Sequence, residues 1–314
     1  MKNYLTEIIR IARPVHWIKN FAIFAALVFT GHLFDKLLFL KVVYAFIAFS
    51  FATSATYVFN DILDVNLDKL HPIKKNRPIA SGKLSIKSAF LELTILSSIS
   101  LYLASGINSL FFFAVAGYLF IQFCYSLGLK NYPIIDIIII AFGFIIRIYA
   151  GAFVINAHLS VWFLLCVIST ALFLASGKRR AELNILETVG VTRKSLIKYK
   201  RELLNSYVTM FGNASWMSWA LFTFFESPPV SVPVWIFLAE LSKTTAINKL
   251  LMITIPVSIF GIMRYQSLIF EGKSEAPEKL LLSDKALITS VFIWLSIIIW
   301  VLYGGVAIFP RINP

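Results

Sequence analysis

An acidic run followed by a basic one separates two apolar segments of the chain: residues 60–82 read NDILDVNLDKLHPIKKNRPIASG. The apolar residues before this stretch predict a helix that continues into it. At about 100° per residue, Asp61, Asp64 and Asp68 then lie within about 60° of one another on a single helical face. The stretch therefore places three carboxylates together at the end of an apolar helix.

These carboxylates predict a cation site. Three carboxylates this close repel one another and raise one another's pKa, so they need neutralisation. Mg²⁺ prefers carboxylate oxygens and completes its coordination with waters and a substrate's phosphates. Pro72 and Pro78 bend the following chain, so that Lys74 and Arg77 return toward the same place. A helix end with merely solvated charges is the alternative, and it suits one aspartate better than three.

The composition of the whole chain requires a membrane. Of its 314 residues, 59% are hydrophobic and 14% are charged, and the mean hydropathy is +0.80. Soluble domains carry roughly 25% charged residues. This much apolar side chain cannot be hidden inside a 35.5 kDa globule, so soluble enzymes and disordered proteins are excluded. Cys124 and Cys166 both lie in apolar runs, so no disulfide framework is expected.

Apolar segments suited to crossing a bilayer recur along the chain. Nine are predicted, at approximately residues 19–34, 38–59, 88–106, 109–128, 134–155, 159–177, 206–225, 250–270 and 286–308. Segment 226–249 holds three prolines around a short apolar piece, which is typical of a re-entrant or interfacial segment. We therefore expect an all-α integral membrane protein in which residues 1–314 form a single membrane domain.

The distribution of lysine and arginine predicts the orientation. Most of them lie before the first span or in the loops on that same side, above all 60–87 and 178–205. The positive-inside rule puts the N-terminus and these two loops in the cytoplasm, as caps on a multi-pass protein of the cell's inner membrane. We attribute the net charge of +13 to topology and to anionic substrates, and we expect no nucleic acid partner.

Several polar and charged residues lie within the spans or where the spans meet these loops. They are Lys19, Tyr125, Lys130, Asp136, Arg147, Lys178 and Arg179. An arginine inside a span needs a partner or an anionic ligand. Arg147 lies about three turns after Asp136 on the same helical face, so a structural ion pair and an anionic substrate are both open explanations. For the basic loop 178–205, topology alone is the competing explanation.

The pattern Asn60-Asp61-x-x-Asp64-x-x-x-Asp68 resembles the first aspartate-rich motif of the UbiA-type intramembrane prenyltransferase superfamily. Other stretches are similar to its decaprenyl-phosphate phosphoribosyltransferase branch. They are Arg13-Pro14-x-x-Trp17-x-Lys19-Asn20, His71-Pro72-x-Lys74-x-x-Arg77-Pro78, Tyr125-Ser126-x-x-Leu129-Lys130, Gly143-Phe144-x-x-Arg147-x-x-Ala150-Gly151, Lys178-Arg179-Arg180-Ala181-Glu182, Arg264-Tyr265 and Pro277-Glu278 to Asp284. The resemblance implies nine helices around a central cavity open to lipid.

The resemblance also implies a reaction, in which 5-phosphoribose passes from phosphoribosyl pyrophosphate to a polyprenyl phosphate, of decaprenyl type, with Mg²⁺ as cofactor. One departure from the superfamily is that residues 178–205 contain no aspartate, where a second aspartate motif is usual. Asp136 is therefore expected as the further acidic metal ligand. A basic second loop suits two anionic substrates better than a neutral aromatic acceptor.

The expected roles divide the candidates into groups. Asp61, Asp64 and Asp68 hold Mg²⁺ and act in catalysis, and Asn60 orients them. The donor's phosphates are assigned to Lys74, Arg77, Lys130 and Arg147, the lipid phosphate to Lys19, Lys178 and Arg179, and general substrate binding to Tyr125. His16, His32, His71 and His158 receive no role.

Two other functions stay open. The first is prenyl transfer to an aromatic acceptor. The second is transport, although the acidic cluster lies at the cytoplasmic end of the spans and not at the middle of the bilayer, where transporters bind their substrates. The sequence also leaves open the chain length of the lipid and whether the protein is a homo-oligomer.

Overall fold

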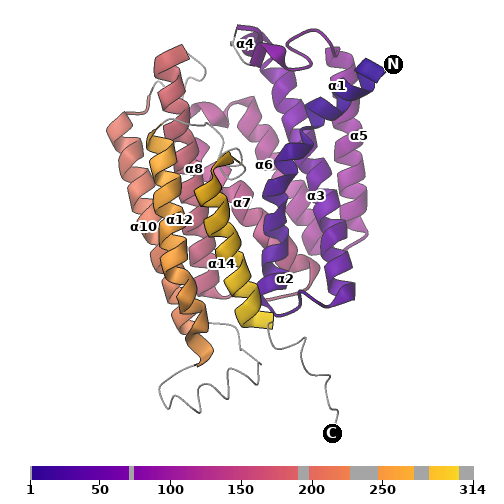
Figure 1. Ribbon diagram of the computed structural model, residues 1–314. Coiled ribbons are helices and arrows are strands. Elements are labelled where there is room, and N and C mark those ends of the chain that lie inside the picture. Colours follow the sequence, from indigo (N-terminus) through magenta and orange to yellow (C-terminus); the bar gives the residue numbers. More distant parts are fainter. Residues whose placement is uncertain (1, 71–73, 190–197, 227–246, 272–282, 304–314) are drawn as a thin grey trace.

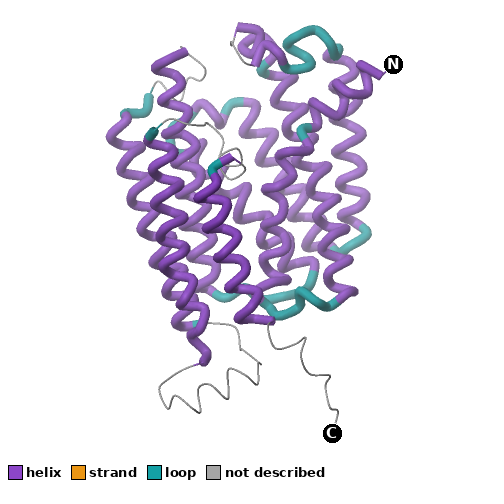
Figure 2. Tube along the Cα trace, in the orientation of Figure 1, coloured by secondary structure: helices purple, strands orange, loops and turns teal. Residues whose placement is uncertain are grey.

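The protein is a bundle of helices, seen here in a computed structural model that describes residues 2–70, 74–189, 198–226, 247–271 and 283–303. Helices joined by short loops make up these residues, and no strand occurs among them (Figures 1 and 2). The elements are α1 (Lys2–Ala12), η1 (Pro14–Phe24), α2 (Ala25–Phe29), α3 (Lys36–Leu63), α4 (Val65–Leu70), η2 (Lys74–Asn76), α5 (Ile86–Ser105), α6 (Ser109–Leu127), η3 (Leu129–Asn131), α7 (Ile135–Val154), α8 (Val161–Val189), α10 (Arg201–Phe225), η4 (Ile247–Ile253), α12 (Thr254–Phe270) and α14 (Lys285–Tyr303).

The all-helical membrane prediction is confirmed, but the number of spans differs from the expected nine. Within the described residues, 7 helical segments are long and apolar enough to cross a membrane, in α3, α5, α6, α7, α8, η4–α12 and α14. The expected spans 19–34 and 206–225 are also helical. The first forms only the short η1–α2 segment, and the second belongs to α10, which is outside this apolar class. Most of segment 226–249 lies outside the described residues.

The two expected cap loops are partly helical. Helix α3 continues to Leu63 and carries Asp61 in its last turn, and α4 carries Asp68. Helix α8 continues to Val189, so Lys178 and Arg179 lie on a helix. Helix α8 thus runs on past residue 177, where the predicted span ends, because a helix can pass from apolar to charged sequence without ending.

The helices stand side by side in one bundle (Figure 1). Helices α3, α5 and α6 stand on one side, α10, α12 and α14 stand on the other, and α7 and α8 lie between them. At the end opposite α4, Tyr303 of α14 joins the two sides, since its Oη donates to the Val28 carbonyl oxygen of α2 at 2.6 Å. Large apolar side chains such as Phe113 and Phe292 face outward and are 68% and 70% exposed. Such exposure is favourable because lipid, not water, surrounds them.

A close crossing between η1 and α7 fixes part of the bundle interior. A Cβ atom added to Gly151 of α7 would lie 1.9 Å from the carbonyl oxygen of Ile23 in η1. Small residues allow backbones to approach in this way. Since η1 also carries Lys19 and Asn20, the glycine determines how deeply both side chains enter the bundle.

Replacing Gly151 with alanine is expected to destabilise the protein. The added methyl group must displace η1, and overpacking of this kind costs about 1–3 kcal/mol of the free energy of unfolding. Gly117→Ala in α6 is the matched control, because nothing lies within 4 Å of a Cβ atom there. Thermal unfolding of the detergent-solubilised protein gives the melting temperature of each variant. Equal melting temperatures for Gly151→Ala and Gly117→Ala would contradict the close crossing of η1 and α7.

Candidate functional site

A polar cavity of about 290 Å³ lies at the α4 end of the bundle, between η1, α3, α6, α7 and α8. The cavity gathers residues that are far apart in the sequence. Seven of the predicted site residues line it: Lys19, Asn60, Lys74, Arg77, Tyr125, Arg147 and Lys178.

Asp61 is neutralised by two arginines. It is 2% exposed, and Arg13 Nη2 donates to its two carboxylate oxygens at 2.5 and 2.7 Å. Arg77 Nη1 lies 3.0 Å from Asp61 Oδ1. Both guanidinium groups line the cavity. Arg13 has a left-handed backbone with a φ of 52°, directly before Pro14, an uncommon conformation that is typical of functional sites.

Asp68 shares Arg77 with Asp61, and Asp64 has other partners. Asp68 Oδ2 accepts from Arg77 Nη1 at 2.6 Å, whereas Asp64 Oδ1 accepts from Lys130 Nζ at 2.6 Å and Asp64 Oδ2 from Asn60 Nδ2 at 3.0 Å. Burial raises the pKa of Asp68, Arg77 opposes that shift, and the charge of Asp61 adds to it. The expected repulsion between carboxylates is therefore present, and basic side chains offset it.

These carboxylates fit a Mg²⁺ site that a substrate completes. Asp61 Oδ1 and Asp68 Oδ2 bond the same nitrogen of Arg77, so two hard oxygen donors converge on one positive charge. In the part of the chain that the structure describes, no group of three His, Cys, Asp or Glu side chains could hold a metal ion. A Mg²⁺ ion would need waters and substrate phosphates as further ligands, as Mg²⁺ commonly has in proteins.

Arg147 is held in the cavity wall by neutral groups. Its Nε donates to Asn20 Oδ1 at 2.7 Å, its Nη2 donates to Tyr118 Oη at 3.0 Å, and its Nη1 donates to the Gly143 carbonyl oxygen. The Arg147–Asp136 ion pair that the spacing left open is therefore wrong. An arginine in a span satisfied only by dipoles keeps its full positive charge available to an anion.

Asp136 and Arg179 pair with each other instead. Both side chains are 0% exposed, and Arg179 Nε lies 2.7 Å from Asp136 Oδ2. Arg179 also bonds Glu182 and donates to Tyr125 Oη at 2.6 Å, while Tyr199 Oη donates to Asp136 Oδ1 at 2.7 Å. Asp136 and Arg179 are buried in this pairing and do not line the polar cavity, so their expected roles as metal ligand and phosphate ligand stay predictions. Both hold α7 and α8 together beside Tyr125.

Some cavity residues were missing from the predicted set. They are Arg13, His16, Thr56, Tyr57, Tyr118, Gln122, Ser126, Ile140, Gly143, Phe144, Leu174 and Glu182. Arg13 was visible in a motif but received no role, because only the fold shows that α1 and η1 meet the end of α3. Of the four histidines, His16 lines this cavity, His158 lies at the opposite end of the bundle, and His71 is outside the described residues.

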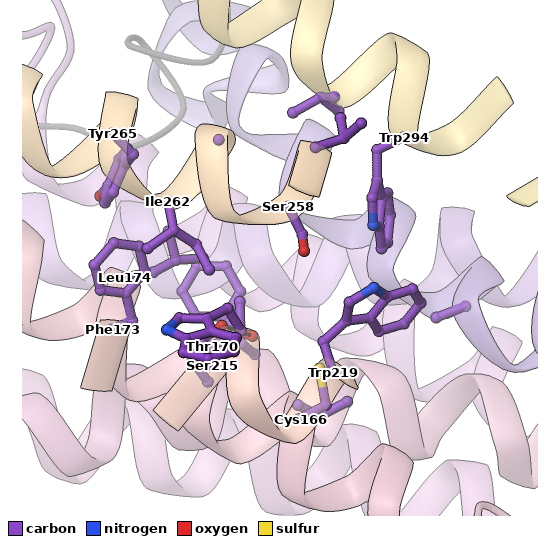
Figure 3. Close-up of a pocket in the computed structure, with 18 of the residues that line it drawn as sticks. Cys166, Thr170, Phe173, Leu174, Ser215, Trp219, Ser258, Ile262, Tyr265 and Trp294 are labelled. Carbon is purple, nitrogen blue, oxygen red and sulfur yellow. Dashed lines mark hydrogen bonds between the residues drawn. The ribbon is translucent and has the colours of Figure 1, made fainter. Parts of the chain in front are cut away.

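An apolar cavity of about 400 Å³ adjoins the polar one. The two share Phe144 and Leu174 in their walls. Figure 3 shows some of the side chains around the apolar cavity, among them Trp219 of α10, Tyr265 of α12 and Trp294 of α14. A charged headgroup and an apolar chain could therefore be bound side by side.

A family model, curated relatives and solved structures were compared with this chain, and all three point to the same family. Residues 20–224 match the model of the UbiA prenyltransferase family. The chain is 34% identical to a decaprenyl-phosphate phosphoribosyltransferase of Corynebacterium glutamicum, over 96% of this chain and 88% of the relative, and 33% identical to one of Mycolicibacterium smegmatis, over 95% and 92%. A UbiA homologue from Archaeoglobus fulgidus bound to GPP and Mg²⁺ shares the fold with a TM-score of 0.67 and 19% identity, covering 96% of this chain and 100% of that one.

The buried Asp136–Arg179 ion pair is expected to contribute to the stability of the protein. Arg179→Gln leaves Asp136 charged and buried beside a neutral partner, which should lower the free energy of unfolding by about 3–5 kcal/mol. Adding Asp136→Asn should restore part of that loss. Arg264→Gln, which breaks a more exposed pair with Asp284, is the control and should change the stability much less. Denaturant unfolding in detergent tests this, and wild-type stability of Arg179→Gln would refute the assignment.

Proposed function

The chain belongs to the UbiA prenyltransferase family, and from this membership we propose that it transfers a 5-phosphoribosyl group from phosphoribosyl pyrophosphate to a polyprenyl phosphate, with Mg²⁺, releasing pyrophosphate. The names of its relatives support this reaction. We further propose that it resides in the inner membrane with the polar cavity facing the cytoplasm, where the basic residues concentrate.

The charge of the polar cavity is the observation that carries the proposal. Among its lining residues, six are cationic (Arg13, Lys19, Lys74, Arg77, Arg147 and Lys178) and one, Glu182, is acidic. Two anionic substrates, a phosphoribosyl diphosphate and a lipid phosphate, account for such an excess. A neutral aromatic acceptor would make no use of these positive charges, whereas phosphate oxygens can accept charge-assisted hydrogen bonds from them.

The donor's diphosphate is assigned to the part of the cavity lined by Arg13, Asn60 and Arg77, whose side chains bond Asp61, Asp64 and Asp68. Asp61 and Asp68 would hold Mg²⁺, with Asp64 and Asn60 fixed beside them through Lys130. When bound, the metal supplies positive charge to the leaving diphosphate. Arg13 and Arg77 lie next to that position and can form charge-assisted hydrogen bonds to phosphate oxygens.

The transfer itself needs little from an acid or base. The bond between the anomeric carbon and the diphosphate oxygen breaks, and the diphosphate leaves with the electron pair. A lipid phosphate oxygen forms the new bond to the anomeric carbon, which develops oxocarbenium character as in glycoside hydrolysis. Because the attacking phosphate is already ionised, no strong base is required. The cationic wall stabilises the growing negative charge on the leaving group.

The lipid acceptor is assigned to the junction of the two cavities. Lys19 and Lys178 line the polar cavity and are candidates for its phosphate. Its first isoprene units would pass Phe144 and Leu174 into the apolar cavity, whose wall is almost wholly hydrocarbon. Packing of such a chain against the cavity wall contributes dispersion contacts, since lipid itself is as apolar as the wall.

Prenyl transfer is the second candidate, because a solved homologue of the same fold is bound to GPP and Mg²⁺. Purified protein should be incubated with Mg²⁺ under two conditions: labelled phosphoribosyl pyrophosphate with polyprenyl phosphates, and a prenyl diphosphate with aromatic acids. Mass spectrometry should detect lipid-linked phosphoribose in the first reaction. A prenylated aromatic product with no lipid-linked ribose would replace the proposal by the second candidate.

Asp61→Asn should reduce turnover by a factor of about 100 or more, since one charged ligand of the diphosphate site is lost. Asn keeps the shape of the side chain, so the protein should remain folded and monodisperse in detergent. The control is Glu226→Gln at the opposite end of the bundle. Near-normal turnover of Asp61→Asn at saturating Mg²⁺ would exclude this carboxylate from the site.

Lys178→Ala should raise the KM for the lipid phosphate and leave the KM for the donor nearly unchanged. Lys178 lies one helical turn after Leu174 on α8, and Leu174 also lines the apolar cavity, which favours the acceptor side. Lys198→Ala, which removes an exposed lysine beyond α8, is the matched control. A rise in the donor's KM alone would mean that the two subsites are exchanged.

A further inference from the structure

The apolar cavity ends at a layer of phenylalanines. Phe29 of α2 and Phe163 of α8 line this cavity and also a third cavity of about 220 Å³. Phe222 of α10 lines the third cavity as well. The ring centroids are 4.8 Å apart for Phe29 and Phe163, 5.3 Å for Phe163 and Phe222, and 5.8 Å for Phe29 and Phe222. We call these three residues the aromatic floor.

The third cavity differs in character from the apolar one. Thr30, His158, Ser160 and Glu226 contribute to its wall, and it lies at the end of the bundle opposite α4. Because Phe29 and Phe163 face both cavities, the aromatic floor is one side chain thick. It therefore separates hydrocarbon surroundings from polar ones.

The aromatic floor is held in place by close packing. Phe163 is 5% exposed and Phe222 is 2% exposed. Trp219 packs against Phe222 with ring centroids 5.5 Å apart, and Trp294 packs against Trp219 at 5.0 Å. Figure 3 shows these two tryptophans turned toward each other at the cavity wall. These ring contacts hold the aromatic floor between the two cavities.

Resting on the proposed function, we propose that the aromatic floor limits the length of acceptor chain that the protein encloses and so sets the shortest acceptor bound with full affinity. Lys19 and Lys178 fix the phosphate at one end, and the floor stops the chain at the other. Isoprene units beyond that length must turn out into the bilayer. Each enclosed unit exchanges fluid lipid or detergent for packed contacts with the cavity wall, and each unit outside the cavity gains no such contacts.

The test is a series of polyprenyl phosphates of increasing length. With the wild type, binding measured by native mass spectrometry without donor should tighten with each added isoprene unit until the floor is reached, and then stay level. Phe163→Ala joins the two cavities, so its affinity should level off at a longer acceptor. Phe163→Trp narrows the cavity and should level off at a shorter one.

The control is Phe113→Ala on the lipid-facing side of α6, which should keep the wild-type length profile. Folding is checked by the melting temperature of each variant, and the KM for the ribosyl donor should not change with the floor. Folded Phe163 variants that both keep the wild-type profile overturn the proposal. Ribosyl transfer is assayed separately: if the length profiles shift as expected but no lipid-linked ribose forms, the proposed function fails and the floor stands.

Discussion

A charge that leaves water must be neutralised, and in this protein that constraint organises both the fold and the site. The carboxylates at the end of α3 and in α4 lie at the edge of an apolar bundle, where an unpaired ion is costly. Arg13 comes from the segment before η1, and Arg77 from the chain after η2. The need for counter-charges therefore draws distant parts of the sequence to one end of α3, and their meeting encloses the polar cavity.

The same constraint explains which parts of the site the sequence could predict. Helical periodicity places Asp61, Asp64 and Asp68 together, because neighbours on one helix are fixed by local geometry. Partners on different helices are not. The spacing that aligned Asp136 with Arg147 on α7 was correct, yet each found its partner elsewhere, in Arg179 and Asn20. Nothing in a single sequence says which helix will face which.

The fold, like the site, could be predicted only in part. Apolar segments located the helices, since the bilayer imposes helical structure on any chain that crosses it. Their ends were less certain, as the continuation of α8 to Val189 shows. The junction of a polar and an apolar cavity at Phe144 and Leu174 was beyond reach, because it depends on how α7 and α8 pack in three dimensions. That junction is nonetheless what allows a water-soluble donor and a lipid to meet.

Two buried arginines show how surroundings decide a role. Arg179 is neutralised by Asp136 and Glu182, so it exerts little net attraction on a ligand and acts as a structural tie. Arg147 is 5% exposed, but it bonds an amide oxygen, a phenol and a backbone carbonyl, which orient its guanidinium group without cancelling its charge. Dipoles hold it in the cavity wall at full strength, as preorganised electrostatic sites require. Of two arginines that the sequence treats alike, only the one without a carboxylate can draw a phosphate into the cavity.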